Sequence, residues 1–187
     1  MKNVQVRLRA VEPEDVDFMY ACEADRQNSL WSDCRAPLSK HQLIDYALGY
    51  VADPFKAGQL RLIIETFSEG EKKPRAAGIL DIYEISAADS KGYVGICIHP
   101  DFRRRGIAEG ALTEFLVFNR VKLGLHNLVA KVSEENKAAL RLFEKCGFSP
   151  IALLPSWHRI GLSFHNFHLL QINPHLLKIC GEMGEIL

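Results

Sequence analysis

The sequence predicts a mixed α/β fold, in which helices cover both faces of a central twisted sheet of about six to seven strands. Segments with the two-residue periodicity of strands follow one another quickly between residues 60 and 98. A helix, a strand and a second helix come next, between 107 and 146, and two strands at 151–154 and 164–171 close the sheet. No linker, repeat or low-complexity stretch interrupts this order, so we expect a single domain over residues 1–187.

The N-terminal quarter predicts one strand and two helices. Val6 and Leu8 alternate with polar neighbours, which is typical of a half-buried strand. Pro13 begins a helix whose first turn is acidic, as the helix dipole favours. After an irregular loop at 25–38, Ser39 is expected to cap the second helix.

The middle of the chain predicts an antiparallel hairpin followed by a central strand. Residues 60–67 and 76–85 are rich in Leu and Ile, and a polar segment with Gly and Pro separates them. After a turn at 87–92, residues 93–98 alternate larger side chains with Gly95 and a cysteine, which indicates a short buried strand.

The stretch that follows this strand carries the strongest functional signal. Arg103 to Gly106, three arginines and a glycine, lie where the strand turns into a helix. The first turn of a helix has four backbone N–H groups without a helical partner and the positive end of the helix dipole. Because Gly106 lets a ligand approach the backbone closely, we expect a phosphate-binding site here. Neither the Walker pattern nor the dinucleotide glycine pattern is present.

A second pattern occupies residues 127–148. Leu128 to Val132 predicts a strand, and Asn136 is expected to cap a short helix that ends at Gly147. The end of this helix reads Glu-Lys-x-Gly-Phe.

Together the two patterns resemble the signatures of one enzyme family. Arg103-x-x-Gly106-x-Ala108 is similar to the acyl-coenzyme A signature of the GCN5-related N-acetyltransferases (GNAT), Arg/Gln-x-x-Gly-x-Gly/Ala. Residues 127–148 resemble the second signature, in the right order and at the usual separation. The resemblance extends over most of the chain and is nearest to the spermidine and ribosomal-protein N-terminal acetyltransferase branches. It implies a GNAT fold and attack of an amine on the thioester of acetyl-coenzyme A (acetyl-CoA).

The resemblance also implies where acetyl-CoA binds. The pantetheine arm is expected along the central strand, where the backbone of Ile96, Cys97 and Ile98 would supply its hydrogen bonds. The N–H of Ile98 matches the position that polarises the thioester carbonyl. The side chains of Arg103 and Arg105 are expected to add positive charge for the pyrophosphate. The backbone amides expected to hold the pyrophosphate are those of Arg104, Arg105, Gly106, Ile107 and Ala108.

Three further positions are assigned by comparison with the second signature. Asn136 matches the residue that touches the pantetheine arm. Phe143 is expected beside the cofactor, but it stands where many members have a tyrosine that protonates the departing thiolate. Lys131 replaces a family glutamate. Since phenylalanine has no proton to give, two outcomes are open: a slower transferase, or a protein that binds acyl-CoA with little or no transfer.

The acceptor side is placed by the resemblance near the segment after the first strand. Trp31, Asp33 and Tyr46 are therefore candidate substrate-binding residues, and ordinary packing explains Trp31 and Tyr46 equally well. Asp81 is the candidate base and substrate contact, and Glu84, at odd spacing, is expected on the opposite face of the strand.

The amine itself stays open at this point. At pH 7 a lysine-like amine costs roughly 4.6 kcal/mol to deprotonate, whereas a protein N-terminus costs only roughly 1–1.4 kcal/mol. A polyamine such as spermidine therefore needs a base more than a peptide N-terminal amine does. The acyl group could be acetyl or larger.

The composition excludes several other classes of protein. The 23 basic residues balance 23 acidic ones, so the chain lacks the basic footprint of a nucleic-acid-binding protein. Five cysteines without a Cys-x-x-Cys pair predict no disulfide framework and no metal site, which suits the cytoplasm. No signal peptide or membrane span is expected. The apolar tail from Pro174 is compatible with a homodimer.

Overall fold

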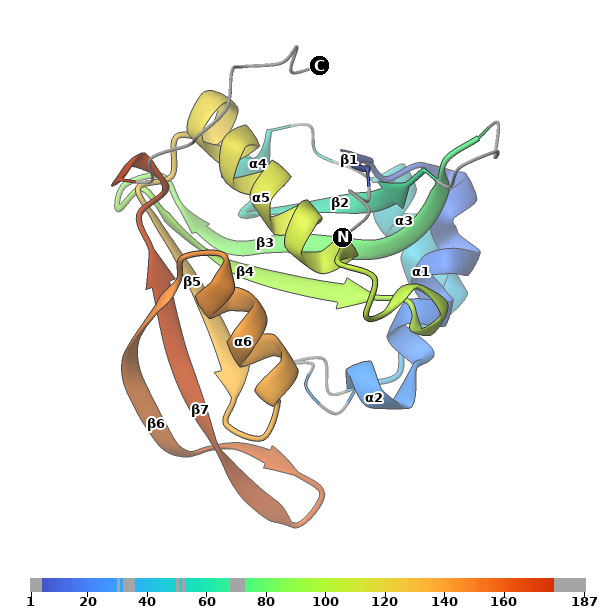
Figure 1. Cartoon of the computed structure of the whole chain (residues 1–187). Helices are drawn as coiled ribbons and strands as arrows, with labels where there is room; N and C mark the ends of the chain where they lie inside the picture. The colour runs from blue at the N-terminus through green and yellow to red at the C-terminus, as the bar shows by residue number, and fades with distance from the viewer. Residues whose placement is uncertain are drawn as a thin grey trace.

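In the computed structural model the chain folds around a seven-stranded mixed sheet (Figure 1). The structure describes residues 5–29, 31, 36–49, 51, 53–67 and 73–176, and only the backbone of Gln27 and Ser29. The strands are β1 (Val6–Ala10), β2 (Gln59–Thr66), β3 (Arg75–Ser86), β4 (Lys91–Ile98), β5 (Asn127–Ser133), β6 (Ser149–Ile160) and β7 (Ser163–Ile172). They lie in the order β1-β2-β3-β4-β5-β7-β6.

The helices differ from the prediction mainly by two short additions. They are α1 (Val16–Ala24), α2 (Arg26–Ser29), α3 (Lys40–Leu48), α4 (Pro54–Ala57), α5 (Ile107–Phe118) and α6 (Lys137–Lys145). The 3-10 turns are η1 (Pro13–Asp15), η2 (Pro100–Phe102) and η4 (Pro174–Leu176), and η3 (Asn119–Leu123) is a π-helical turn. The unexpected α4 has its own local signal, because Asp53 caps it and Pro54 stands at its first position. None of the described helices is long and apolar enough to cross a membrane.

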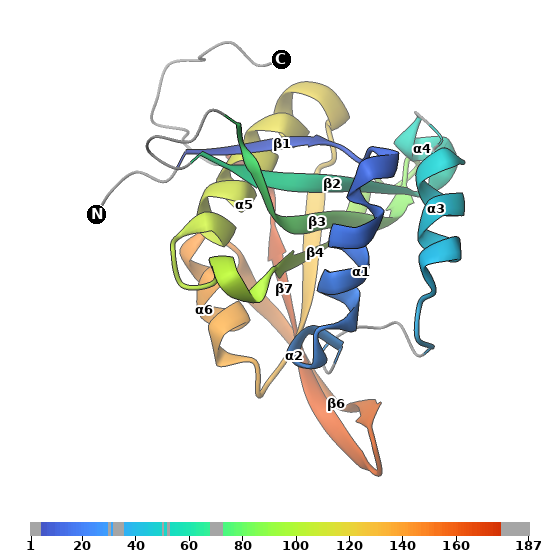
Figure 2. The same cartoon turned by 90° about the vertical axis from the view of Figure 1, so that its right-hand side faces the viewer.

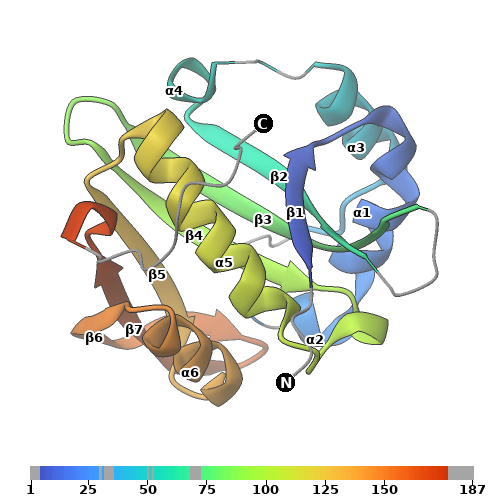
Figure 3. The same cartoon turned by 45° about the horizontal axis from the view of Figure 1, so that its top comes forward.

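Helices cover both faces of the sheet, as the sequence predicts. Figure 2 shows the strands between α5 and α6 on one side and α1 and α3 on the other, and Figure 3 shows α5 lying across the strands. Side chains alternate between two apolar cores. The core under α5 includes Leu80, Val94, Leu112 and Phe115, and the core under α1 and α3 includes Met19, Leu43, Ile63 and Ile79. The central strands β2 to β4 are therefore covered on both faces.

One pair of neighbouring strands, β4 and β5, runs parallel, and this pair positions the site. Strands β1 to β4 are antiparallel neighbours. β4 and β5 are parallel and pair only from Lys91↔Asn127 to Tyr93↔Val129, after which they diverge (Figure 1). β5 then pairs with β7.

The two closing strands are longer than expected and form a projecting hairpin. β6 and β7 extend beyond the body of the molecule (Figure 1). Trp157, which we expected in the turn, belongs to β6, and Gly161 and Leu162 make the turn instead. Several large apolar side chains of this hairpin are exposed: Ile151, Leu153, Trp157, Leu162 and Phe164. The end of the tail that we expected to pack on a neighbour, residues 177–187, lies outside the described part.

A buried ion cluster joins the first strand to the sheet and to η1. Arg9 donates to Glu65 at 2.7 Å and to both oxygens of Asp15 at 2.6 and 2.7 Å. Arg7 donates to Glu65 as well. Burial alone would raise the pKa of Asp15 and of Glu65, but the arginine hydrogen bonds hold both below their ordinary values.

Candidate active site

The candidate site is built on the gap where β4 and β5 diverge. Backbone alternation decides which amides of β4 face this gap. The N–H of His99 donates to the Ala77 carbonyl at 2.9 Å, so every second residue back from His99 bonds to β3. The amides of Ile96 and Ile98 therefore face the gap. The expected contribution of the Cys97 backbone is corrected, because its N–H and C=O point to β3.

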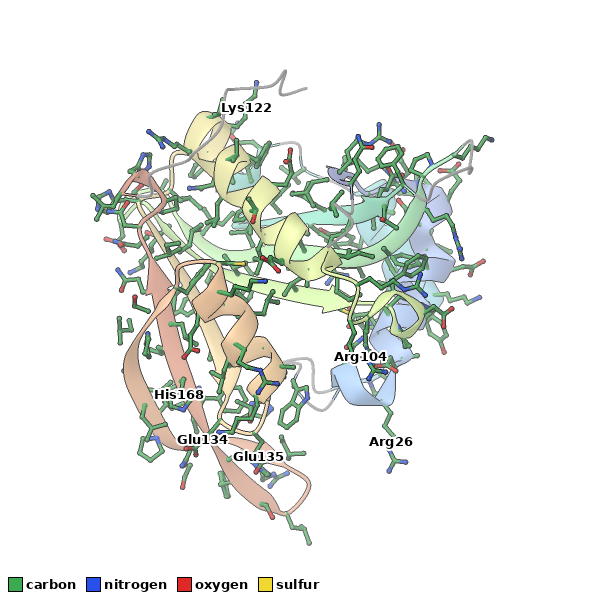
Figure 4. The ribbon with its side chains drawn as sticks, viewed as in Figure 1. Arg26, Arg104, Lys122, Glu134, Glu135 and His168 are labelled. Atoms are coloured by element: carbon green, nitrogen blue, oxygen red, sulfur yellow. The ribbon has the colours of Figure 1, made fainter. Side chains whose placement is uncertain are left out.

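The turn after β4 presents further backbone amides. Arg104 and Gly106 have φ angles of 60° and 79°, which turn the chain sharply between η2 and α5. The carbonyl of Gly106 accepts from the Gly110 N–H at 3.0 Å, so the first-turn amides of Ile107 and Ala108 have no helical partner. Figure 4 shows Arg104 in this turn. The turn has the geometry of the anion-binding site predicted from the sequence.

The Arg103 side chain joins β4 to the segment around α2 and does not supply charge to the turn. Its Nε donates to the Ile98 carbonyl at 3.0 Å, and its Nη2 donates to Asp25 at 2.6 Å and to the Asn28 Oδ1 at 3.0 Å. Asn28 also donates to the Cys97 Sγ at 2.9 Å. These bonds tie the end of β4 to the segment around α2. The expected role of the Arg103 side chain as a charge for the pyrophosphate is therefore corrected.

The other two arginines of the turn lie at the surface. Arg104 and Arg105 are both exposed. The Arg105 guanidinium lies 5.6 Å from the centre of the Phe102 ring, and that of Arg75 lies 5.0 Å from the same ring. The positive charge near the turn amides therefore comes from Arg104 and Arg105.

The opposite wall of the gap comes from β5 and α6. Asn136 caps α6 through its Oδ1, which accepts from the Ala139 N–H at 3.1 Å, and this leaves the Asn136 Nδ2 for a ligand. Phe143 is 3% exposed and packs edge-on against Phe148 at 5.0 Å. Asn136, Phe143 and Lys131 all line the same cavity. Lys131 of β5 and Phe143 of α6 thus share one wall of the cavity. Side chains return to the same face every two residues in a strand and about every 3.6 residues in a helix.

A cavity of about 570 Å³ opens from this gap onto the α1 and α3 face. Its lining includes Trp31 and Tyr46, two of the expected substrate residues, and the β4 residues from Val94 to Cys97. Ile98 is not part of the lining. Asp33 lies outside the described residues.

A charged cluster lies in the wall of this cavity. Arg61 and Asp81 are cross-strand partners on β2 and β3, with Nε–Oδ1 and Nη2–Oδ2 distances of 2.7 and 2.9 Å. Glu23, in the last turn of α1, lies 3.1 Å from the same Nη2, and the Tyr46 ring lies 5.5 Å from the guanidinium. Burial alone would lower the pKa of Arg61, but Asp81, Glu23 and Tyr46 hold it above its ordinary value. The arginine therefore remains charged.

These contacts change the interpretation of Asp81. Both of its oxygens accept from Arg61, so a role as general base would require the bidentate pair to open. Glu84 is exposed and does not line the cavity.

Two further groups near the gap carry a proton that a thiolate could accept. Ser133 lines the cavity, but it is buried and its Oγ accepts from the Glu135 N–H at 3.3 Å. Cys146 does not line the cavity, and burial, with a smaller effect of Glu109, raises its pKa to about 11. No group of three or more His, Cys, Asp or Glu side chains that could bind a metal occurs within the described ranges.

Sequence reasoning missed Arg61 and Gly95 as residues of the site. Arg61 is a charged residue in a strand otherwise rich in Leu and Ile, and this signal could have identified it. In the register, Arg61, Asp81 and Gly95 form one row across three strands. A Cβ at Gly95 would make ordinary van der Waals contacts with the Tyr83 ring and the Asp81 Cβ, at 3.7 and 4.0 Å, and Gly95 lines the cavity.

Comparison with known proteins identifies the family. A family model described as an acetyltransferase (GNAT) domain matches residues 5–149. The chain belongs to this GNAT family. It is therefore an acetyl-CoA-dependent N-acetyltransferase.

Curated relatives of this GNAT protein include two spermidine N(1)-acetyltransferases. The Vibrio cholerae protein is 25% identical over 147 residues, which cover 78% of this chain and 80% of the relative. The Escherichia coli K12 protein is 26% identical over 148 residues, which cover 77% and 73% of the two chains. A mouse α/β-tubulin N-acetyltransferase is 33% identical over 63 residues, but these cover only 34% and 26%.

Solved structures agree on the fold. The Vibrio cholerae spermidine N-acetyltransferase in complex with CoA and spermine superposes with a TM-score of 0.82 at 21% identity, over 91% of this chain and 96% of that chain. A dodecameric structure of spermidine N-acetyltransferase from the same organism gives a TM-score of 0.76 at 23% identity, over 91% and 94%. The predicted GNAT fold is thereby confirmed.

Proposed function

We propose that this GNAT protein transfers the acetyl group of acetyl-CoA to a primary amine that enters through the cavity on the α1 and α3 face. One observation supports the proposal most directly. The same cavity is lined by β4, whose amides face the gap, and by the charged residues Glu23, Arg61 and Asp81. A site for a cofactor backbone and a site for an amine thus share one space.

The residues present fit acetyl-CoA. The gap offers the amides of Ile96 and Ile98 to the pantetheine arm, the turn offers the amides of residues 104–108 to the pyrophosphate, and Asn136 offers its Nδ2. Bound acetyl-CoA supplies the acetyl group as an electrophilic thioester.

We assign the amide that polarises the thioester carbonyl to Ile96, in place of the Ile98 expected from sequence. Both amides face the gap, but Ile96 lines the acceptor cavity and Ile98 does not. An N–H donor stabilises the developing oxyanion only if it lies where the amine attacks.

The acceptor in this proposal is a polyamine, such as the spermidine named in the relatives, or a peptide N-terminal amine. The relatives' names favour the first. The cavity favours a less charged amine, because the charged side chains in the described part of its lining are two carboxylates, Glu23 and Asp81, and two cations, Arg61 and Lys131. The departing thiolate meets Phe143, which has no hydroxyl group.

The test is release of free CoA from acetyl-CoA, with spermine, spermidine, lysine and N-terminal peptides supplied in parallel. Release with at least one amine is the expected result. Acetyl-CoA binding without release on any amine would contradict the proposal and favour the alternative, an acyl-CoA-binding protein with little or no transfer. Replacing acetyl-CoA with longer acyl thioesters in the same assay identifies the acyl group.

A pair of glycine variants tests the cofactor assignment. Gly106→Val strains the turn, because φ at this position is 79°, and should weaken acetyl-CoA binding. Gly161→Val is the matched control, since Gly161 also has a positive φ, 62°, but lies in the β6–β7 turn. Equal acetyl-CoA dissociation constants for the two variants would contradict the assignment.

A cytoplasmic location and a homo-oligomer are also proposals. The described cysteines, Cys22, Cys97 and Cys146, are free thiols, which suits a reducing compartment. The exposed apolar residues of the β6–β7 hairpin suit a contact with a second copy, and light scattering measures the oligomeric state.

A further inference from the structure

We propose that Glu23 binds the ammonium group of the acceptor, and that the Arg61–Asp81 pair restricts the acceptor to amines with a single positive charge. This inference rests on the proposed function, because it names the residue and the substrate class of the same site. Three features of the cavity wall support it.

The first feature is the geometry of Glu23. This residue lies in the last turn of α1, and its side chain is 23% exposed and lines the cavity. Its Oε1 lies 3.1 Å from the Arg61 Nη2. No hydrogen bond to the Glu23 carboxylate occurs in the part of the chain that the structure describes. One carboxylate oxygen therefore remains for a cation that enters the cavity.

The second feature is that Asp81 has no carboxylate oxygen left for a cation. Each of its oxygens accepts a hydrogen bond from Arg61, in a bidentate arrangement that is the strongest geometry for such a pair. The charges of Arg61 and Asp81 therefore cancel, and Glu23 supplies the remaining negative charge of the cluster.

The third feature is the space next to the cluster. The row Arg61–Asp81–Gly95 ends at a glycine that has no side chain to fill the cavity of about 570 Å³ which all three residues and Glu23 line. An amine held by Glu23 therefore has room beside β4.

The charge balance then limits the acceptor. A polyamine carries several positive charges, but among the described lining residues only Glu23 has a carboxylate that is not held in a bidentate pair, and Lys131 adds a positive charge that opposes a second ammonium group. An amine with one charge meets no such penalty. We therefore expect a peptide N-terminus or a simple monoamine to be preferred over spermidine.

Equilibrium binding of amines to the CoA-loaded protein, measured by calorimetry, tests this without relying on turnover. Glu23→Gln preserves the shape of the side chain and should raise the amine Kd about 10- to 100-fold, the value of one charge-assisted hydrogen bond. The Kd of acetyl-CoA should not change. Glu114→Gln, on the exposed face of α5, removes the same charge elsewhere and should change neither constant.

A second variant tests the selection by charge. Lys131→Gln removes one cation from the cavity and leaves the Arg61–Asp81 pair intact, so it should lower the spermidine Kd several-fold and leave the monoamine Kd nearly unchanged. Arg61 itself is not replaced, because the loss of its bidentate pair would leave the half-buried Asp81 without its cation and destabilise the fold.

The outcomes distinguish a failure of this inference from a failure of the proposed function. Amine binding that Glu23→Gln does not weaken, or a wild-type protein that binds spermidine more tightly than monoamines, overturns the inference and leaves the proposed function standing. A wild-type protein that neither binds any amine nor releases CoA overturns the proposed function, and the inference with it.

Discussion

Substitution of Phe143 by tyrosine tests whether the missing proton donor limits the rate. Phe143 lines the cavity and is 3% exposed, so a hydroxyl at the end of its ring lies at the boundary between the cavity and the core. A positioned general acid typically contributes about 10²–10⁴-fold to a rate. If protonation of the thiolate limits turnover, Phe143→Tyr should raise kcat at least about tenfold, which corresponds to about 1.4 kcal/mol of barrier.

The same substitution has a cost that depends on where the hydroxyl points. A hydroxyl that faces the cavity can bond to water and should change the free energy of unfolding by less than about 0.5 kcal/mol. A hydroxyl that faces Phe148 would be buried without a partner and cost about 1–3 kcal/mol. Denaturant unfolding distinguishes these cases, and only the first is compatible with a gain in kcat.

Phe148→Tyr is the matched control. Phe148 is the edge-on partner of Phe143, is equally buried and does not line the cavity, so its hydroxyl should lower stability without raising kcat. Rate measurements on CoA release across about pH 6 to 10 provide a second readout, since a tyrosine acid loses its proton near pH 10. An unchanged kcat in a stable Phe143→Tyr protein would refute the view that the missing hydroxyl limits the reaction.

Three further measurements test other parts of the structure. Gly95→Val adds a side chain to the cavity lining at the end of the charged row. Because the added Cβ would make only ordinary contacts, at 3.7 and 4.0 Å, the variant should raise the amine KM at least about tenfold with little loss of stability, and an unchanged KM would place the amine elsewhere. Arg9→Met should cost about 2–4 kcal/mol of unfolding free energy at pH 7, in urea denaturation, because it leaves Asp15 without its cation. Since Arg9 holds the pKa of Asp15 and Glu65 below their ordinary values, this stabilisation is present above about pH 4 and is lost as the pH falls through the folded-state pKa values; a variant with the same acid slope as wild type would contradict the assignment. Cys146, whose pKa burial raises to about 11, should resist alkylation at about pH 8 in the folded protein and react after denaturation, as peptide mass spectrometry would show.

The fold, and the backbone geometry of the turn and of α6, were largely readable from the sequence, because the signals involved are local. Strand and helix periods repeat every two or about 3.6 residues, and the capping of α6 joins Asn136 to an amide three residues away. The turn from Arg104 to Ala108 acts through its own backbone, so its geometry follows from one glycine and the start of one helix.

Tertiary structure alone decided the acceptor side, because each decisive contact joins residues far apart in the chain. In the sequence, Arg103 stands beside residues that are expected to bind an anion. In the structure its guanidinium instead donates to Asp25, 78 residues away. From the sequence, Asp81 is a candidate general base. The strand register, however, places Arg61 directly opposite it. Glu23 lies beside the Arg61–Asp81 pair because α1 packs over that register. Register and helix packing are set by the burial of whole apolar faces, which no short stretch of sequence contains.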